Sequence, residues 1–477
     1  MKHWLMLVGL LLFSLCRKSE AEKICRSETL AGLPTLLCGN ITNPVSDQQL
    51  ATELKDLLKR DHFRTIIIDN SASKHTLSFT ISEQLFAGFT SVVRLQIRNA
   101  KLISPVDSKV LKPLNVMANT LQLLSITYCT EVYFELITSI FDTGDKFPNL
   151  RQLNLDYNTG NMRLSLSTLT PAAVILEQLT FSGTILSSIS TDCSKGGKWR
   201  SLKYLDLSDN VAPDSAPAAF FSKFNISIFE CFPNLEWLSL QNNGITTEKF
   251  WDILPGLPPS LTDLNVANNR ISYFNFTQLE RLPKLRNLTI SQNSNFLSGT
   301  DTSGNVTFPL LPNLENLWLR NTGLSRIPAD LLDKMQKLTT LDCRDNTDIT
   351  IFPNNLVARF WEYGRNPRTQ QILLQSTSLG CKCENYNLMH WLASGVGHTP
   401  AGDGIFCYPD GRGNTRLCPS CKLKNDVAIG LETAYDNQEV KTMNCPAPPA
   451  HSENSCAVFA SSFLSLCVTF VVSMAGL

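Results

Sequence analysis

The sequence predicts an α/β solenoid, a right-handed horseshoe in which short strands form one parallel β-sheet along the concave side. Three observations support this prediction: a nine-residue motif that recurs, a nearly constant interval between its copies, and an asparagine at its end. Seven copies read Leu-x-x-Leu-x-Leu-x-x-Asn or a one-residue variant, and they start at residues 150, 202, 235, 261, 285, 314 and 338. This motif at this interval is typical of leucine-rich repeats, which bury their apolar sides only by stacking on one another.

Four weaker copies extend the array towards the N-terminus. They start at residues 63, 92, 121 and 176 and keep apolar residues at the three leucine positions. Consecutive starts are 24 to 33 residues apart, and three successive intervals are 29 residues. An ordinary leucine-rich helical protein would not keep such an interval. We therefore expect about 11 repeats over residues 61–362.

Each repeat predicts the direction of its own side chains. Alternate residues of a strand point to opposite faces, so the leucines face the core and the residues between them line the concave sheet. The asparagine past the strand has one acceptor and two donors, which suit it to hold backbone groups of neighbouring turns. Cys129 stands at the asparagine position of its repeat and Cys343 at a leucine position, so both are predicted to be buried free thiols.

The N-terminal residues 1–21 are typical of a secretory signal peptide. Lys2 precedes an apolar run over 4–15, and small residues stand at 19 and 21. About a dozen apolar residues are too few to span a bilayer as a helix. We expect the mature chain to begin near Glu22, in an oxidising compartment.

The C-terminal residues resemble a signal for a glycosylphosphatidylinositol (GPI) anchor. After a proline-rich linker over 446–454 come small residues, a short spacer and an apolar run over 463–477. This order predicts lipid attachment at Asn454 and removal of 455–477. A transmembrane helix over 457–477 is the alternative, because 21 residues rise about 31 Å. No Lys or Arg follows that would anchor its cytoplasmic end.

Disulfide-bonded caps are predicted at both ends of the repeats, since a solenoid end exposes an apolar face. The N-terminal cap covers 22–60 and the C-terminal cap 363–445. The predicted bridges are Cys25–Cys38, Cys193–Cys231, Cys381–Cys407, Cys383–Cys418 and Cys421–Cys445. Zinc bound by the C-terminal cysteines is the alternative, which an oxidising compartment disfavours.

Composition and motifs argue against several functions. The chain has 42 basic and 42 acidic residues, so no nucleic-acid partner is expected. Hydrolase, metalloprotease and phosphate-binding motifs are absent from the sequence, so we expect no enzyme, no cofactor and no metal. Five sequons predict glycosylation at Asn40, Asn225, Asn275, Asn287 and Asn305.

A ligand-binding surface is predicted on the concave sheet. Tyr204 and Trp237 occupy the same motif position in successive repeats, so their side chains should touch. Aromatic side chains among charged and amide groups are typical of protein-binding hot spots, although the pair would also stabilise a solvated sheet. The predicted binding residues are Arg98, Asp156, Tyr157, Tyr204, Asp206, Trp237 and Gln241. A glycan on Asn287 would lie on the same sheet.

The repeat motif, the cysteine-bounded N-terminal cover and Cys381-Lys382-Cys383 followed by His390-Trp391-Leu392 resemble animal extracellular leucine-rich-repeat proteins. The linkers between repeats are similar to those of Toll-like receptor ectodomains, although no intracellular signalling domain is expected here. The resemblance implies recognition of a protein or glycan outside the cell. Two roles fit it: a surface adhesion protein, or an innate-immune co-receptor that delivers its ligand to a separate signalling chain.

Overall fold

The computed structural model describes residues 24–39, 47–57, 60–73, 76–82, 84–103, 114–141, 147–160, 162–165, 169, 175–184, 186–190, 198–210, 226–272, 275–297, 307–353, 355–357, 371–374, 377, 379, 385, 388, 406–407 and 429–430. These residues form two compact units that divide between Phe296 and Leu297.

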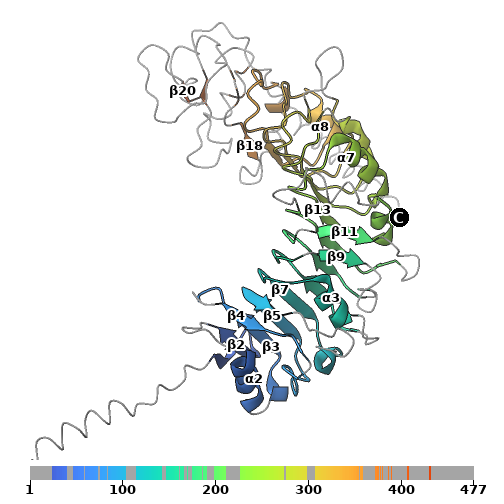
Figure 1. The fold of residues 1–477 in the computed structure, drawn as a ribbon. Coiled ribbons are helices and arrows are strands. Elements are labelled where there is room, and N and C mark those ends of the chain that lie inside the picture. Colours follow the sequence, from blue (N-terminus) through green and yellow to red (C-terminus); the bar gives the residue numbers. More distant parts are fainter. Residues whose placement is uncertain are drawn as a thin grey trace, which may run out of the picture. The chain divides into compact units, whose positions relative to one another are not determined.

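The first unit is built on one long sheet (Figure 1). An antiparallel hairpin begins it, and the strands that follow pair in parallel. In order across the sheet the strands are β1 (Cys25–Leu30), β2 (Leu33–Gly39), β3 (Thr65–Asp69), β5 (Arg94–Arg98), β7 (Leu123–Thr127), β8 (Gln152–Asn154), β10 (Gln178–Thr180), β12 (Tyr204–Asp206), β13 (Trp237–Ser239), β14 (Asp263–Asn265) and β15 (Asn287–Thr289). Equal motif positions lie side by side, and the predicted leucine-rich-repeat solenoid with its parallel sheet is confirmed.

Short helices and secondary strands connect the strands of this sheet. They are α2 (Asp47–Asp56), η1 (Arg60–His62), β4 (Leu77–Phe79), β6 (Ala100–Leu102), η2 (Asn115–Met117), α3 (Phe134–Phe141), β9 (Met162–Ser165), β11 (Leu186–Ser190), η3 (Ile226–Cys231), α7 (Thr247–Ile253), η4 (Leu254–Gly256) and η5 (Phe276–Arg281), where η marks a 3-10 helix. Figure 1 shows α3, β9 and β11 on the side of the solenoid away from the main sheet. We name the sheet face that lacks the core leucines the open face.

The second unit continues the same repeat. Its parallel strands are β16 (Asn316–Trp318), β17 (Thr340–Asp342) and β18 (Gln371–Leu373), with α8 (Leu331–Lys334) between the first two; β19 (Phe406–Cys407) and β20 (Ile429–Gly430) pair antiparallel.

Strand β18 lies beyond residue 362, where the repeats were predicted to end. It pairs with β17, so that Leu341 lies beside Ile372. Thr377 takes the place of the asparagine, and its Oγ1 donates to the Leu374 carbonyl at 2.7 Å. The motif is hidden in the sequence because threonine replaces both its first leucine, at Thr369, and its asparagine.

The motif residues make the core as predicted. Leu235, Leu238 and Leu240 are fully buried, as are their counterparts in other repeats. Asn269 Oδ1 accepts hydrogen bonds from the backbone N–H groups of Asn243 and Ile245, both at 3.0 Å, and its Nδ2 donates to backbone carbonyls. Asn158, Asn210, Asn243, Asn293 and Asn346 bridge neighbouring turns in the same manner.

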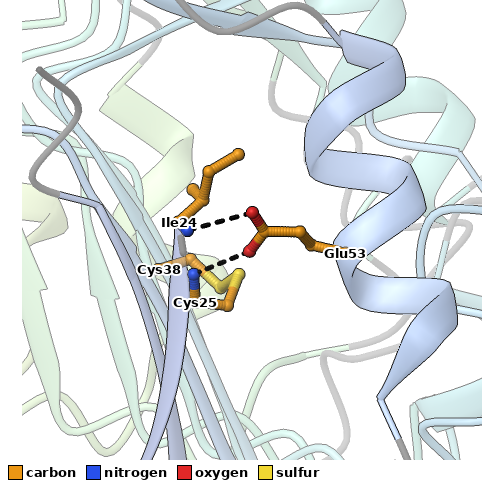
Figure 2. Close-up of a disulfide and its surroundings, with 4 residues drawn as sticks. All are labelled: Ile24, Cys25, Cys38 and Glu53. Atoms are coloured by element: carbon orange, nitrogen blue, oxygen red, sulfur yellow. Dashed lines mark hydrogen bonds between the residues drawn. A yellow bond between two sulfur atoms is a disulfide. The ribbon is translucent and has the colours of Figure 1, made fainter. Parts of the chain in front are cut away.

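The N-terminal cap contains the predicted disulfide between Cys25 and Cys38, which face each other across β1 and β2. Figure 2 shows that Glu53, on α2, also holds this hairpin. Its carboxylate accepts hydrogen bonds from the backbone N–H groups of Ile24 and Cys25 at 3.1 and 3.0 Å. The cap is therefore fastened by a covalent bond and by a carboxylate that the sequence did not predict.

The remaining cysteine predictions are tested only in part. Cys129 and Cys343 are buried free thiols, as expected, and burial raises the pKa of Cys129 to about 11. Cys231 is disulfide-bonded, whereas its predicted partner Cys193 lies outside the described residues. The structure does not describe the side chains of Cys381, Cys383, Cys407, Cys418, Cys421, Cys445, Asn40, Asn225, Asn305 or Asn454. Within the part that it describes, no helix is long and apolar enough to cross a membrane.

Candidate functional site

Two aromatic side chains stack on the open face of the first unit. Tyr204 begins β12 and Trp237 begins β13, and the register pairs them directly. Their ring centroids are 3.9 Å apart and their planes differ by 6°. The predicted contact between the two residues is therefore confirmed. Both side chains are half-buried rather than fully exposed, because each ring covers one face of the other.

Two carboxylates lie beside this stack. Asp156 follows β8 and Asp206 ends β12, and both are half-buried. Burial, together with the charge of Asp206, raises the pKa of Asp156 to about 6, although its carboxylate accepts a hydrogen bond from the Ser182 N–H at 2.7 Å. Burial also raises the pKa of Asp206. Tyr204 is close to both acids, and burial with these two charges raises its pKa to about 12.

The residue just before the asparagine position turns the chain away from the sheet in ten repeats. This residue has a left-handed backbone, with φ between 51° and 62°, at Asn99, Tyr128, Tyr157, Gly183, Asp209, Asn242, Asn268, Gln292, Asn321 and Asp345. Asparagine, aspartate and glycine tolerate this conformation best, and they fill seven of these ten positions. The pattern was readable in the sequence, but the repeat motif does not include this position.

The side chain of Tyr157, at the left-handed position of its repeat, extends across the next repeat. Its ring lies over Gly183, where a Cβ atom would come within 2.4 Å of Tyr157 Cδ1. Its hydroxyl donates to Asp209 Oδ2 at 3.0 Å, two repeats away. On its other side it stacks on Tyr128, with ring centroids 4.9 Å apart. Tyr128 and Tyr157 remain 55% and 40% exposed, which makes them the most accessible aromatic groups near the acids.

Between the acids, β10 carries a buried hydroxyl. The register places Thr180 between Asn154 on β8 and Asp206 on β12. Thr180 is 3% exposed, and its Oγ1 has no hydrogen-bond partner among the described residues. It nevertheless lies close enough to Asp156 to lower the pKa of that carboxyl, although burial raises the same pKa by more. We name Asp156, Tyr157, Thr180, Tyr204, Asp206, Asp209 and Trp237 the acid–aromatic patch.

Two of the predicted binding residues do not join this patch. Arg98 lies on β5, which β7 separates from β8, and it pairs with Asp69 at 4.0 Å. Gln241 follows β13, where its Oε1 accepts a hydrogen bond from Asn265 Nδ2 at 2.9 Å. Conversely, the sequence did not point to Thr180 or Asp209.

The two sequons that the structure describes differ in their surroundings. Asn287 begins β15 on the open face, as predicted, where it is half-buried and its Nδ2 donates to Asp263 at 2.5 Å. Asn275 is exposed, and its Oδ1 accepts hydrogen bonds from Thr277 at the start of η5. Glycosylation at either residue remains a prediction.

Known proteins resemble the chain only in part. No family model matches it. A segment of 94 residues is 38% identical to podocan-like protein 1 of Homo sapiens, and it covers 20% of this chain and 17% of that protein. Similar solved structures include a TLR13–ssRNA13 complex, with a TM-score of 0.43, 17% identity and coverage of 76% of this chain and 60% of that chain. An internalin of Listeria monocytogenes has a TM-score of 0.37, 17% identity and coverage of 65% and 80%. On its own repeat motif and its stacked parallel strands, this chain is a leucine-rich-repeat protein.

Proposed function

We propose that this chain is a cell-surface binding glycoprotein that recognises an extracellular protein through the acid–aromatic patch. The stack of Tyr204 on Trp237 carries this proposal. Two large rings held face to face at 3.9 Å lose little conformational freedom when a partner covers them. Aromatic side chains in such positions dominate the energy of protein interfaces, especially when polar groups surround them.

The location of the protein is a second part of the proposal. The apolar leader over 1–21, the sequons and the Cys25–Cys38 disulfide support an extracellular chain. We infer that a GPI anchor at Asn454 holds it on the outer face of the cell membrane. Phosphatidylinositol-specific phospholipase C should then release the chain from cells that express it in full length. Retention after this treatment would favour the transmembrane alternative and would leave the binding proposal untouched.

The binding surface is tested by comparing two tryptophans. The full-length chain, displayed on cells, captures biotinylated surface and secreted proteins, which quantitative mass spectrometry identifies. Trp237→Ala is expected to weaken capture of the partner by about 2 kcal/mol, or roughly 30-fold in Kd. Trp318→Ala is the matched control, because Trp318 is a half-buried tryptophan on the open face of the second unit.

The control variant should retain the captured proteins within about twofold, since surface substitutions away from a hot spot have small effects. Equal capture by wild type and Trp237→Ala would remove the patch as the binding surface. Thermal unfolding of each variant separates lost binding from lost folding.

The same cells distinguish the two roles that fit the sequence. Aggregation of cells that express the chain would favour adhesion. Capture of a soluble ligand without aggregation would favour a co-receptor that presents its ligand to a separate signalling protein.

A further inference from the structure

The acids of the patch differ from three other acids on the open face in their lack of a cationic partner. Asp263 on β14 also lacks one among the described residues, but Thr262 Oγ1 and Asn287 Nδ2 donate hydrogen bonds to its carboxylate. Asp69 pairs with Arg98, Asp342 with Arg344, and Asp345 with Arg320. Among the described residues, no Lys or Arg lies within ion-pair distance of Asp156, Asp206 or Asp209. Half-buried carboxylates that lie near one another without a counter-charge are unfavourable, so this arrangement has a cost in the free protein.

The buried hydroxyl of Thr180 is a separate sign that the patch is incomplete. Buried polar groups are nearly always hydrogen-bonded, and an unsatisfied one destabilises the fold by about 1–3 kcal/mol. Thr180 lies on the strand between the two acids, and its Oγ1 lacks a partner among the described residues. A hydroxyl oxygen accepts hydrogen bonds, so a donor that displaces the side chains covering this buried oxygen would satisfy it together with both carboxylates.

We propose that the acid–aromatic patch binds an arginine or lysine side chain of the partner, above Thr180 and between Asp156 and Asp206. This inference rests on the proposed function and names the chemistry that the binding surface recognises. The cation supplies donors to the two carboxylates and to the threonine hydroxyl. The same cation lies near the ring of Tyr204, whose π-system attracts positive charge.

A metal ion fits the same residues less well. No group of three or more His, Cys, Asp or Glu side chains close enough to hold a metal exists among the described residues. Calcium takes six to eight oxygen ligands, whereas this patch offers three carboxylates next to aromatic rings, and Tyr157 and Asn242 already donate to Asp209. Aromatic faces add nothing to metal coordination, but they stabilise the organic cations of arginine and lysine.

The test uses the purified full-length chain and beads that carry a flexible glycine–serine peptide with one central residue. That residue is arginine, lysine, or citrulline, the neutral analogue of arginine. Wild type is expected to bind arginine beads roughly tenfold better than citrulline beads, since charge-assisted hydrogen bonds and cation–π contacts both need the charge. Lysine beads should follow the arginine beads.

Neutralising the two acids should abolish this preference. The double variant Asp156→Asn/Asp206→Asn keeps the oxygen acceptors for the Ser182 and Ser208 N–H groups, so its fold should persist. Its binding to arginine and citrulline beads should agree within about twofold. Thr180→Val, which removes only the hydroxyl, should also reduce the preference. Asp263→Asn on β14 is the control that should retain it.

Equal binding of arginine and citrulline beads by wild type would overturn the proposal, as would a preference that survives in the double variant. Loss of partner capture in Trp237→Ala would then still support the patch as a binding surface. If Trp237→Ala also bound normally, the proposed surface itself would be wrong.

Discussion

The acids on the open face of the second unit and those of the acid–aromatic patch in the first unit are in opposite electrostatic states. In the second unit, Asp342 is 2% exposed, and Arg344 holds it with two hydrogen bonds of 2.9 and 2.7 Å. Asp345 is paired with Arg320 at 2.5 Å. In the patch, the carboxylates of Asp156 and Asp206 accept hydrogen bonds from the uncharged N–H groups of Ser182 and Ser208.

This difference separates acids that maintain the fold from acids that are available to a ligand. A carboxylate that its own chain has neutralised cannot attract a cation. A half-buried carboxylate without a counter-charge keeps that capacity, at a cost in stability. The repeat supplies the same backbone to both kinds of acid, so the side chains of the same and the neighbouring repeat decide whether an acid has a cationic partner.

The largest effect should come from removing the partner of the buried acid. Arg344→Met is expected to destabilise the second unit by about 3 kcal/mol, because it leaves the Asp342 carboxylate buried and unpaired. Methionine retains much of the apolar volume of the arginine stem. Hydrogen exchange of the second-unit strands measures the change.

Arg320→Met provides the comparison within the same unit. Both members of the Arg320–Asp345 pair are about a third or more exposed, so the loss should stay below about 1 kcal/mol. Similar losses in the two variants would show that burial does not determine the strength of these pairs.

A second prediction concerns the left-handed corner position, where Gly183 alone among the ten described residues lacks a side chain. Asn321 and Asp345 carry side chains at the left-handed position in the second unit, whereas Gly183 leaves that position empty under Tyr157. Gly183→Asn should destabilise the first unit by about 2 kcal/mol. Asparagine tolerates the backbone, so the loss comes from displacing a ring that is stacked and hydrogen-bonded.

Repeating Gly183→Asn in a Tyr157→Ala background tests this explanation by a double-mutant cycle in chemical denaturation. The loss should then fall to a few tenths of a kcal/mol. An unchanged loss would assign the effect to the backbone instead of the ring.

Most of the fold was predictable because each residue can be compared with the residues at the same motif position in the other repeats. The leucine core, the bridging asparagines and the Tyr204–Trp237 contact all follow from position within the motif and from the stacking of repeats. Strand β18 is harder to predict, because threonine stands both at its first leucine position, Thr369, and at its asparagine position, Thr377.

The site was less predictable because it depends on distances that the motif does not encode. Tyr157 reaches Asp209 only because Gly183, which lies between them, has no side chain. Arg98 has the motif position of a binding residue, yet Asp69 in the neighbouring repeat neutralises it. The unpartnered hydroxyl of Thr180 depends on the lengths of its neighbours' side chains, so it could not be read from one repeat alone.

The smallest effect, and the one closest to the proposed function, concerns the charge of Asp156. Its pKa in the folded chain is about 6, above the value of 3.8 for an unperturbed aspartate, because it is buried near Asp206. The folded state therefore binds the proton more tightly than the unfolded state, and wild type gains stability as the pH falls from 7 towards 4. Asp156→Asn removes the buried charge and should stabilise the first unit by about 1 kcal/mol at pH 7, after allowance for solvent screening.

The gain from Asp156→Asn should shrink as the pH falls through 6 and vanish below about pH 3, where the wild-type carboxyl is protonated in both states. Unfolding measured between about pH 3 and 7 gives this profile. Asp345→Asn is the matched control: at pH 7 it should lower stability or leave it unchanged, because it removes an ion pair with Arg320. If Asp156→Asn instead destabilised the first unit at pH 7, the carboxylate would be contributing to the fold, and the distinction between the two open faces would fail at its most sensitive point.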